Sequence, residues 1–344
     1  MGTTNPLDKS DFSFAFLCPQ KKGPVEQILS TVPINSWVNW AVRFFPKIGA
    51  FWGSDWGAEE LQRLDSYDAI VVIACKKMMD VVTALRGRFA KSKPILFHHD
   101  GWINSHYSGD PNIGWFEDDF FRACRLCDAG LCHHPNIREF YEYATGRPVA
   151  FVPMLYPPSF REYRVPFKRR DPNKIIVGNT LRCGRGVEPA LLVIRKHFPE
   201  CRIVLQDSQI KPFTTRFGED FNFELYKPID QLAWLEYVSD GFLSIAGDER
   251  GSPGRFQADM AALGIPCITN ERNFRGKHLW PGLLADFVFE MGRVKHLIEE
   301  LRTNPTFWDA HVQLADSMLE AFCSDHAVVV LRESIRTVVK RAEL

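Results

Sequence analysis

The sequence contains no uninterrupted run of about 18 apolar residues, the length that a helix needs to cross a membrane. Its start lacks the basic segment and long apolar stretch of a secretory signal, so none is expected. Neither sign of charge predominates, because 42 Lys and Arg residues balance 42 Asp and Glu residues. These absences argue against a membrane-spanning protein and against general nucleic-acid binding. A soluble, cytoplasmic protein is expected.

The nine cysteines show no regular spacing, which argues against a disulfide framework. A chain of 344 residues, 45% of them hydrophobic, has enough apolar surface to fold without cross-links. The densest cluster is Cys124, Cys127, Cys132, His133 and His134, which has enough ligands for zinc. It coincides with a helix end and a buried strand, so structural packing is the favoured interpretation and no metal is expected.

Short apolar runs alternate with helical stretches along the chain, which is typical of parallel α/β domains. Strands are predicted at 12–18, 68–75, 94–100, 129–134 and 148–154, and again at 174–180, 201–207, 221–226, 241–246, 266–270 and 287–290. The proline- and charge-rich stretch 156–173 indicates an interdomain linker. We therefore expect Rossmann-like domains over 1–160 and 161–322, followed by a helix over 323–344 that returns to the first domain.

Two glycine-rich loops follow predicted strands of the second domain. In the first loop, Arg182 and Arg185 stand among three glycines, and the second loop spans residues 247–254. Glycine lets an anion approach backbone N–H groups, and guanidinium groups stabilise the charge on a leaving phosphate. Each loop alone is equally compatible with a solvated turn. Both, however, follow strands of one sheet, and ligands of parallel sheets bind beyond the carboxyl ends of the strands.

These features resemble the retaining, nucleotide-sugar-dependent glycosyltransferases of GT-B architecture, in which two Rossmann-like domains face each other across a cleft. The resemblance is clearest over residues 174–270. Members of that superfamily carry Gly-Arg and then Lys-Gly after the first strand of the second domain. Here Gly178-Asn179 and Arg185-Gly186 stand at these positions, so Asn179 replaces the arginine and Arg185 replaces the lysine.

A second element of the superfamily, Glu-x7-Glu, ends just before a phrase that matches "ADMAALGIP". Its second acid falls on Asp259, which the resemblance implies to be a ribose ligand. The first acid falls on Gly251, and Glu249 or Asp248 is a displaced candidate for it. A basic position of one branch of the superfamily falls on Arg255.

The resemblance also implies a catalytic site. In "FHHDGW", His99 with Asp100 matches the histidine beside the transferred sugar, and His98 is the nearest rival. Arg182 and Arg185 are implied to stabilise the departing diphosphate. The donor-binding residues that the resemblance implies are Gly178, Asn179, Lys227, Glu249, Ser252, Gly254, Arg255 and Asp259.

An aromatic segment over residues 36–57 contains four tryptophans and three phenylalanines together with two basic residues. Such a segment can dock at a lipid interface or stack against a carbohydrate, and core packing is the alternative. Its place in the first domain makes Trp37, Trp40 and Phe44 candidates for the acceptor side.

The resulting hypothesis is a glycosyltransferase, of hexosyltransferase class, that moves a sugar from UDP or GDP to a hydroxyl. The acceptor is expected to be a glycan, a lipid-linked molecule or a small molecule, with peripheral membrane contact in the lipid-linked case. Retention and independence of metals and other cofactors are expected. Two alternatives stay open: a nucleotide-sugar epimerase of the same architecture, and a non-catalytic homologue that binds a nucleotide or a partner.

Overall fold

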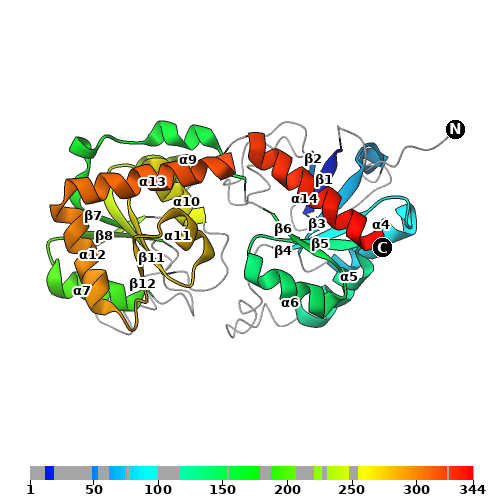
Figure 1. The fold of residues 1–344 in the computed structure, drawn as a ribbon, viewed down its shortest axis with the longest axis horizontal. Helices are drawn as coiled ribbons and strands as arrows, with labels where there is room; N and C mark the ends of the chain where they lie inside the picture. The colour runs from blue at the N-terminus through cyan, green and yellow to red at the C-terminus, as the bar shows by residue number, and fades with distance from the viewer. Residues whose placement is uncertain are drawn as a thin grey trace. The chain divides into compact units, whose positions relative to one another are not determined.

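The structure is a computed structural model of the 344-residue chain. It describes residues 12–18, 49–52, 62–74, 78–99, 116–152, 155–178, 187–206, 221–226, 231–247, 255–323 and 325–343. The chain divides into two compact units, each built around one parallel sheet (Figure 1). Unit 1 comprises residues 1–156 and 324–344, and unit 2 comprises residues 157–323. Among the described helices, none is long and apolar enough to cross a membrane.

The sheet of unit 1 is parallel, with the strand order β2-β1-β3-β4-β5-β6. Its strands are β1 (Phe14–Cys18), β2 (Gly49–Trp52), β3 (Ala69–Ile73), β4 (Ile95–His99), β5 (Ala129–Cys132) and β6 (Val149–Phe151). Strand β4 is buried along its whole length, as expected for a central parallel strand covered by helices on both faces.

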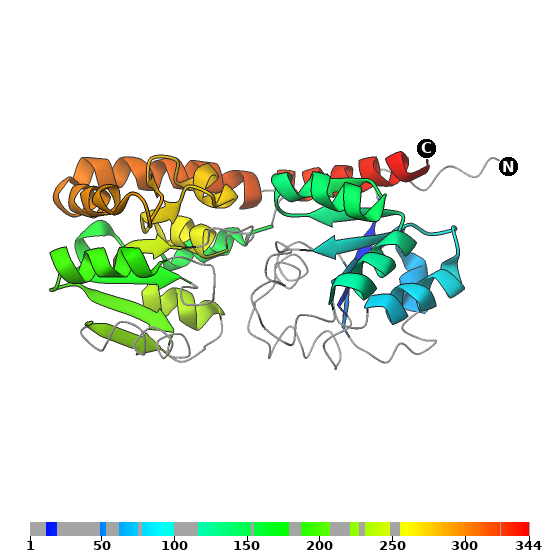
Figure 2. The ribbon, with the colours of Figure 1, turned by 90° about the horizontal axis from the view of Figure 1, so that it is seen from below.

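Among the described residues of unit 1, three helices connect consecutive strands and a fourth comes from the end of the chain. They are α4 (Met78–Phe89), α5 (Phe116–Leu126), α6 (Pro135–Thr145) and α14 (Asp325–Glu343), with a short 3₁₀ turn, η2, at Leu64–Ser66. Helix α14 packs against β5 and β6. Figure 2 shows α14 and α5 on opposite sides of this sheet. Unit 1 is therefore completed by a segment that follows unit 2 in the sequence.

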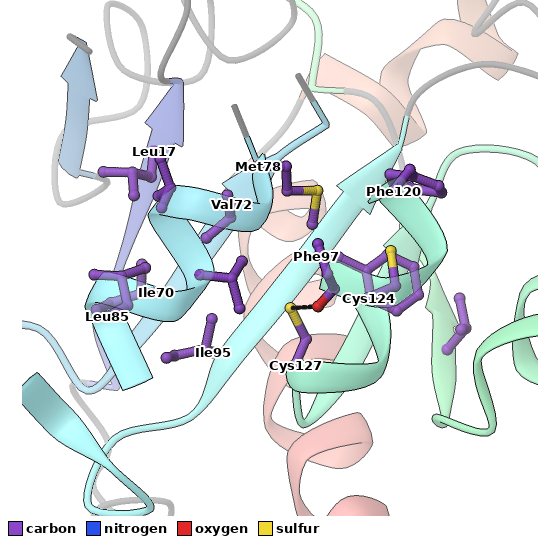
Figure 3. Close-up of a cluster of buried hydrophobic side chains, with 14 of the residues drawn as sticks. Leu17, Ile70, Val72, Met78, Leu85, Ile95, Phe97, Phe120, Cys124 and Cys127 are labelled. Atoms are coloured by element: carbon purple, nitrogen blue, oxygen red, sulfur yellow. Dashed lines mark hydrogen bonds between the residues drawn. The ribbon is translucent and has the colours of Figure 1, made fainter. Parts of the chain in front are cut away.

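The core of unit 1 lies between the sheet and the helices α4 and α5 (Figure 3). Phe97 of β4 packs against Phe120 of α5, with ring centroids 6.3 Å apart. Cys124 and Cys127 are fully buried in the same cluster, and the Cys127 thiol donates to the carbonyl of Ala123. The apolar periodicity of these helices is thus explained by burial against one face of the sheet.

Unit 2 contains a second parallel sheet, with the strand order β12-β11-β10-β7-β8-β9. Its strands are β7 (Asp171–Gly178), β8 (Arg202–Gln206), β9 (Phe223–Tyr226), β10 (Gly241–Ala246), β11 (Cys267–Asn270) and β12 (Leu284–Ala285). Its helices are α7 (Glu188–His197), α9 (Gln231–Val238), α10 (Arg255–Leu263), α11 (Phe274–Leu279), α12 (Met291–Thr303) and α13 (Pro305–Cys323). Helix α7 packs against α12, while α10 packs against α11 and α13. Both units thus have the predicted α/β fold.

Two elements differ from the sequence prediction. The strand predicted at 287–290 is wrong: these residues form a turn, in which Asp286 Oδ1 accepts from the backbone N–H groups of Val288 and Phe289. The observed strand β12 ends at Ala285, two residues before the predicted strand begins. Strand β2 was not predicted from the sequence: its residues, at the end of the aromatic segment, pair with β1 at the edge of the sheet.

The stretch 156–173 is not an extended linker. It forms two 3₁₀ turns, η4 (Pro158–Tyr163) and η5 (Phe167–Arg169), and enters β7 at its end. Arg161 and Arg164 both contact Asp316 Oδ1 on α13, at 3.0 and 2.8 Å. These ion pairs therefore hold the start of unit 2 against a helix of the same unit. Composition alone cannot distinguish such paired charges from solvated ones.

Arg170 is the buried member of this stretch. Its guanidinium donates to the carbonyls of Ser239, Gly241 and Leu263, at 3.1, 2.8 and 2.7 Å, and lies over the ring of Trp308. Burial lowers the pKa of Arg170 to about 10. The side chain therefore links the end of α9, the start of β10 and the end of α10.

We predict that Arg170→Met lowers the free energy of unfolding by about 3 kcal/mol, because buried carbonyls lose charged donors. The matched control is Arg169→Met, at an exposed position one residue earlier, which should change the same quantity by less than about 0.5 kcal/mol. Urea unfolding measures both. Equal stabilities of the two variants would show that the Arg170 contacts contribute nothing.

Candidate functional site

Four of the predicted site residues lie in the described part of the chain: His99, Gly178, Arg255 and Asp259. His99 ends β4, and Gly178 ends β7. Arg255 and Asp259 lie on α10, which begins beyond the carboxyl end of β10. The predicted residues that lie outside the described ranges are Trp37, Trp40, Phe44, Asp100, Asn179, Arg182, Arg185, Lys227, Glu249, Ser252 and Gly254.

Gly178 has a packing role at the end of β7. A Cβ atom built on Gly178 would lie 2.4 Å from Cγ of Phe256, so the ring of Phe256 covers the glycine backbone directly. Phe256 is the neighbour of Arg255 in the first turn of α10. The glycine therefore lets α10 begin close to the end of β7. Gly178, Arg255 and Asp259 thus gather at the carboxyl edge of one sheet, where ligands of parallel α/β folds bind.

Asp259 is 2% exposed, although it is ionisable, and it faces Arg255 one turn earlier on α10. Arg255 Nε lies 3.6 Å from Asp259 Oδ2, and the arginine side chain is 27% exposed. The pair therefore has a buried acid and a cation that reaches solvent. A carboxylate in such a place accepts hydrogen bonds from hydroxyl groups, and the guanidinium offers donors to an anion.

Tyr226, the last residue of β9, belongs to the same edge and was not predicted from the sequence. Burial raises the pKa of Tyr226, while Arg255 lowers it and Asp259 raises it, so both charges act on this hydroxyl. Its ring lies 4.7 Å from that of Trp234 on α9, at an interplanar angle of 33°. The residue directly precedes the predicted donor residue Lys227. Its position at a strand end was the only signal in the sequence.

His99 lies between two aromatic side chains on the face of the sheet that α5 and α6 cover. Its ring centroid is 5.3 Å from Phe120 and 5.7 Å from Tyr141. Tyr141 Oη is 2.5 Å from His99 Nδ1, and His99 is 7% exposed. One ring nitrogen is therefore engaged by α6. Tyr141 lies 42 residues away in the sequence, and no local motif indicates it.

His98, the rival candidate, points away from His99, because consecutive residues of a strand face opposite sides. His98 Nε2 lies 3.0 Å from His133 Nε2, and His133 Nδ1 lies 2.9 Å from the carbonyl oxygen of Val152. Burial, His133 and His99 lower the pKa of His98 well below its ordinary value. The chain of contacts joins the ends of β4, β5 and β6, and it gives His98 a structural role.

The cysteines near this pair are thiols without metal-binding geometry. Burial raises the pKa values of Cys127 and Cys132 to about 12, so both stay protonated at neutral pH. The Cys132 thiol donates to the carbonyl of His134. Within the ranges that the structure describes, no three His, Cys, Asp or Glu side chains form a metal site.

The fold is similar to solved glycosyltransferase structures along nearly the whole chain. An alpha-glucosyltransferase in complex with UDP and a DNA 13-mer is 10% identical, with a TM-score of 0.64 over 95% of this chain and 98% of that one. Anabaena HepE, in complex with UDP and glucose, is 13% identical, with a TM-score of 0.64 over 95% and 99%. α,α-Trehalose 6-phosphate synthase from Burkholderia multivorans is 10% identical, with a TM-score of 0.63 over 96% and 99%.

No protein-family model matches the sequence, and no curated protein matches it either. The structural likeness confirms the predicted GT-B fold. At these low identities it concerns the fold, and the roles of individual residues are argued from their own geometry below.

We predict that Gly178→Ala lowers the free energy of unfolding by about 1–3 kcal/mol, because the new methyl group meets the Phe256 ring. In a Phe256→Ala background the same change should cost much less, since the ring is gone. Gly87→Ala is the control: nothing lies within 4 Å of a Cβ built there, in α4, so stability should rise by about 0.5–1 kcal/mol. If the losses of unfolding free energy from Gly178→Ala and Phe256→Ala simply added in the double mutant, the proposed contact would be contradicted.

His98 should make the protein less stable in acid. Its folded-state pKa is lowered, so below about pH 6.5 the unfolded chain binds a proton that the folded chain does not. The stabilisation is therefore complete above about pH 6.5 and falls by up to about 1.4 kcal/mol per pH unit below it.

His98→Gln keeps an N–H donor toward His133 and removes this titration. Between pH 7.5 and 5.5, the wild type should lose about 1 kcal/mol more unfolding free energy than the variant, measured in urea. The pKa of His134 is also lowered by burial, but that residue is common to both proteins. Identical pH dependence in the two proteins would refute the assignment.

Proposed function

We propose that this protein is a glycosyltransferase that moves a sugar from a nucleoside-diphosphate sugar to a hydroxyl acceptor. The main support is the fold, shared over about 95% of the chain with proteins whose structures contain UDP, UDP-glucose, or UDP and glucose. A second support is the polar edge of unit 2, where Gly178, Arg255 and Asp259 gather. UDP is the donor nucleotide that these neighbours favour.

Asp259 is the proposed ligand of the donor ribose. A carboxylate has two acceptor oxygens, and the two adjacent hydroxyls of a ribose are a matching pair of donors. The acid is buried and held on the first turns of α10, so its position is fixed before the donor arrives. Arg255, partly exposed beside it, is the proposed cation near the diphosphate.

Tyr226 extends this site toward the nucleobase. Its ring is fixed against Trp234 and lies within reach of the charges of Arg255 and Asp259. The neighbouring Lys227 was predicted to be donor-binding from the sequence. A base beside the ribose would therefore meet the end of β9.

The leaving diphosphate is proposed to be stabilised by Arg182 and Arg185. In the sequence, both lie between Gly178, at the end of β7, and α7, which begins at Glu188. The N-terminus of a helix after a parallel strand favours anions, and two guanidinium groups add fixed positive charge. These cations supply the electrostatic stabilisation that a divalent metal provides elsewhere. We therefore propose a metal-independent reaction.

Retention is proposed to arise from attack on the face that the diphosphate leaves, with a leaving phosphate oxygen taking the acceptor proton. His99 of unit 1 is proposed to contact the transferred hexose. The acceptor is a glycan, a lipid-linked molecule or a small molecule. The aromatic segment with Trp37, Trp40 and Phe44 is proposed to belong to the acceptor side of the site.

The test is transfer from UDP-glucose, and from other UDP- and GDP-hexoses, to a panel of hydroxyl acceptors in EDTA. We expect a glycosylated product and free nucleoside diphosphate, with the anomeric configuration retained. Formation of an epimeric donor would identify an epimerase instead. If the protein bound the nucleotide sugars but turned none of them over with any acceptor, it would be a non-catalytic nucleotide-binding protein.

We predict that Asp259→Asn weakens UDP binding about 10- to 100-fold, because the ribose loses charge-assisted hydrogen bonds. The matched control is Asp309→Asn, at an exposed position on α13, which should leave binding unchanged. Calorimetric titration with UDP measures both. Equal affinities of the two variants would remove Asp259 from the donor site.

A further inference from the structure

We propose that Tyr141 is a positioning residue that fixes His99 in one tautomer, with the proton on Nε2. His99 then offers the sugar a hydrogen-bond donor and cannot serve as a base. The contact with the sugar rests on the proposed function, whereas the tautomer is a property of unit 1 alone.

The hydroxyl of Tyr141 lies in an aromatic environment. Tyr141 is fully buried, and its ring packs against Phe97, Phe120 and Phe140 at centroid distances of 6.0, 6.2 and 5.7 Å. A buried phenolic hydrogen needs an acceptor, because leaving it unpaired costs about 1–3 kcal/mol. The structure places His99 Nδ1 2.5 Å from this oxygen.

The acidity of the two groups decides which of them donates. A phenol is a far stronger acid than the N–H group of a neutral imidazole, so the favourable arrangement is O–H of Tyr141 donating to Nδ1 of His99. A neutral histidine carries one ring proton, and its other nitrogen is an acceptor. With Nδ1 accepting, the proton of His99 is on Nε2.

The neighbouring histidines provide an internal comparison on the opposite face of the sheet. A carbonyl can only accept, so the 2.9 Å contact with Val152 requires a proton on His133 Nδ1. The Nε2 atom of neutral His133 is then an acceptor, and His98 must donate to it from its own Nε2. His133 should thus show the Nδ1–H tautomer, while His98 and His99 show the Nε2–H tautomer.

The fixed tautomer has a chemical consequence. A His99 ring with Nδ1 engaged and Nε2 protonated donates a hydrogen bond to a sugar oxygen, and it has no free lone pair with which to remove the acceptor proton. Tyr141 also holds the ring at a set angle through its contact from α6. The proton of the acceptor must therefore leave by another route, as in the proposed transfer to the leaving phosphate.

The direct test is ¹⁵N NMR of the full-length protein with labelled histidine, in which protonated and unprotonated ring nitrogens have distinct chemical shifts. His99 is assigned by comparison with His99→Asn. In the wild type we expect unprotonated Nδ1 and protonated Nε2 for His99. Tyr141→Phe should give a mixture of tautomers, because Nδ1 loses its donor. Tyr143→Phe, on the same helix at a 93% exposed position, is the matched control and should leave the spectrum unchanged.

In the transfer assay, Tyr141→Phe should lower kcat about fivefold, as expected for one hydrogen bond, with a smaller change in KM. Tyr143→Phe should match the wild type. A protonated Nδ1 in wild-type His99 overturns the proposal even if Tyr141→Phe does not fold. An unchanged kcat in a folded Tyr141→Phe variant overturns the positioning role. A wild type that turns over no nucleotide sugar refutes the proposed function, while the spectrum still decides the tautomer.

Discussion

Polar side chains at the ends of buried parallel strands must have hydrogen-bond partners, because water does not reach them and unpaired groups are costly. This constraint organises the carboxyl edge of the unit 1 sheet. His98 meets His133, which in turn meets the carbonyl of Val152, and His99 meets Tyr141. The partners come from neighbouring strand ends on one face and from α6 on the other. A ring whose nitrogens are assigned in this way is pre-oriented for a ligand.

The same edge of unit 2 is organised by close packing. Phe256 covers Gly178, and this contact sets where α10 starts. The start of α10 in turn fixes Asp259 beside Arg255. Both charges shift the pKa of Tyr226, Arg255 downward and Asp259 upward. Arg170 holds the other ends of these elements, because its guanidinium donates hydrogen bonds to carbonyls at the amino end of β10 and at the carboxyl end of α10. The proposed donor site therefore depends on contacts that bind no donor themselves.

Much of the fold was predictable because its signals are local. The predicted strand 94–100 is β4 within one residue at each end, and an apolar run preceding Gly178 gave β7. The turn at 287–290 was mistaken for a strand because Phe287, Val288 and Phe289 form a short apolar run. The carboxylate of Asp286, which accepts from two backbone N–H groups, decides the turn. The role of Tyr141 could not be predicted for a different reason. Tyr141 and His99 are 42 residues apart in the sequence, and their contact depends on how α6 packs. Tyr226 was missed because an aromatic residue in a strand usually indicates packing.

The central claim is that the carboxyl edge of the unit 2 sheet holds a nucleoside diphosphate through Asp259. A crystal structure of the protein with UDP tests this most directly. The account predicts the ribose hydroxyls within hydrogen-bond distance of the Asp259 carboxylate, with the diphosphate toward the loop that follows Gly178. UDP bound elsewhere on the protein, or an empty edge at saturating UDP, would contradict it.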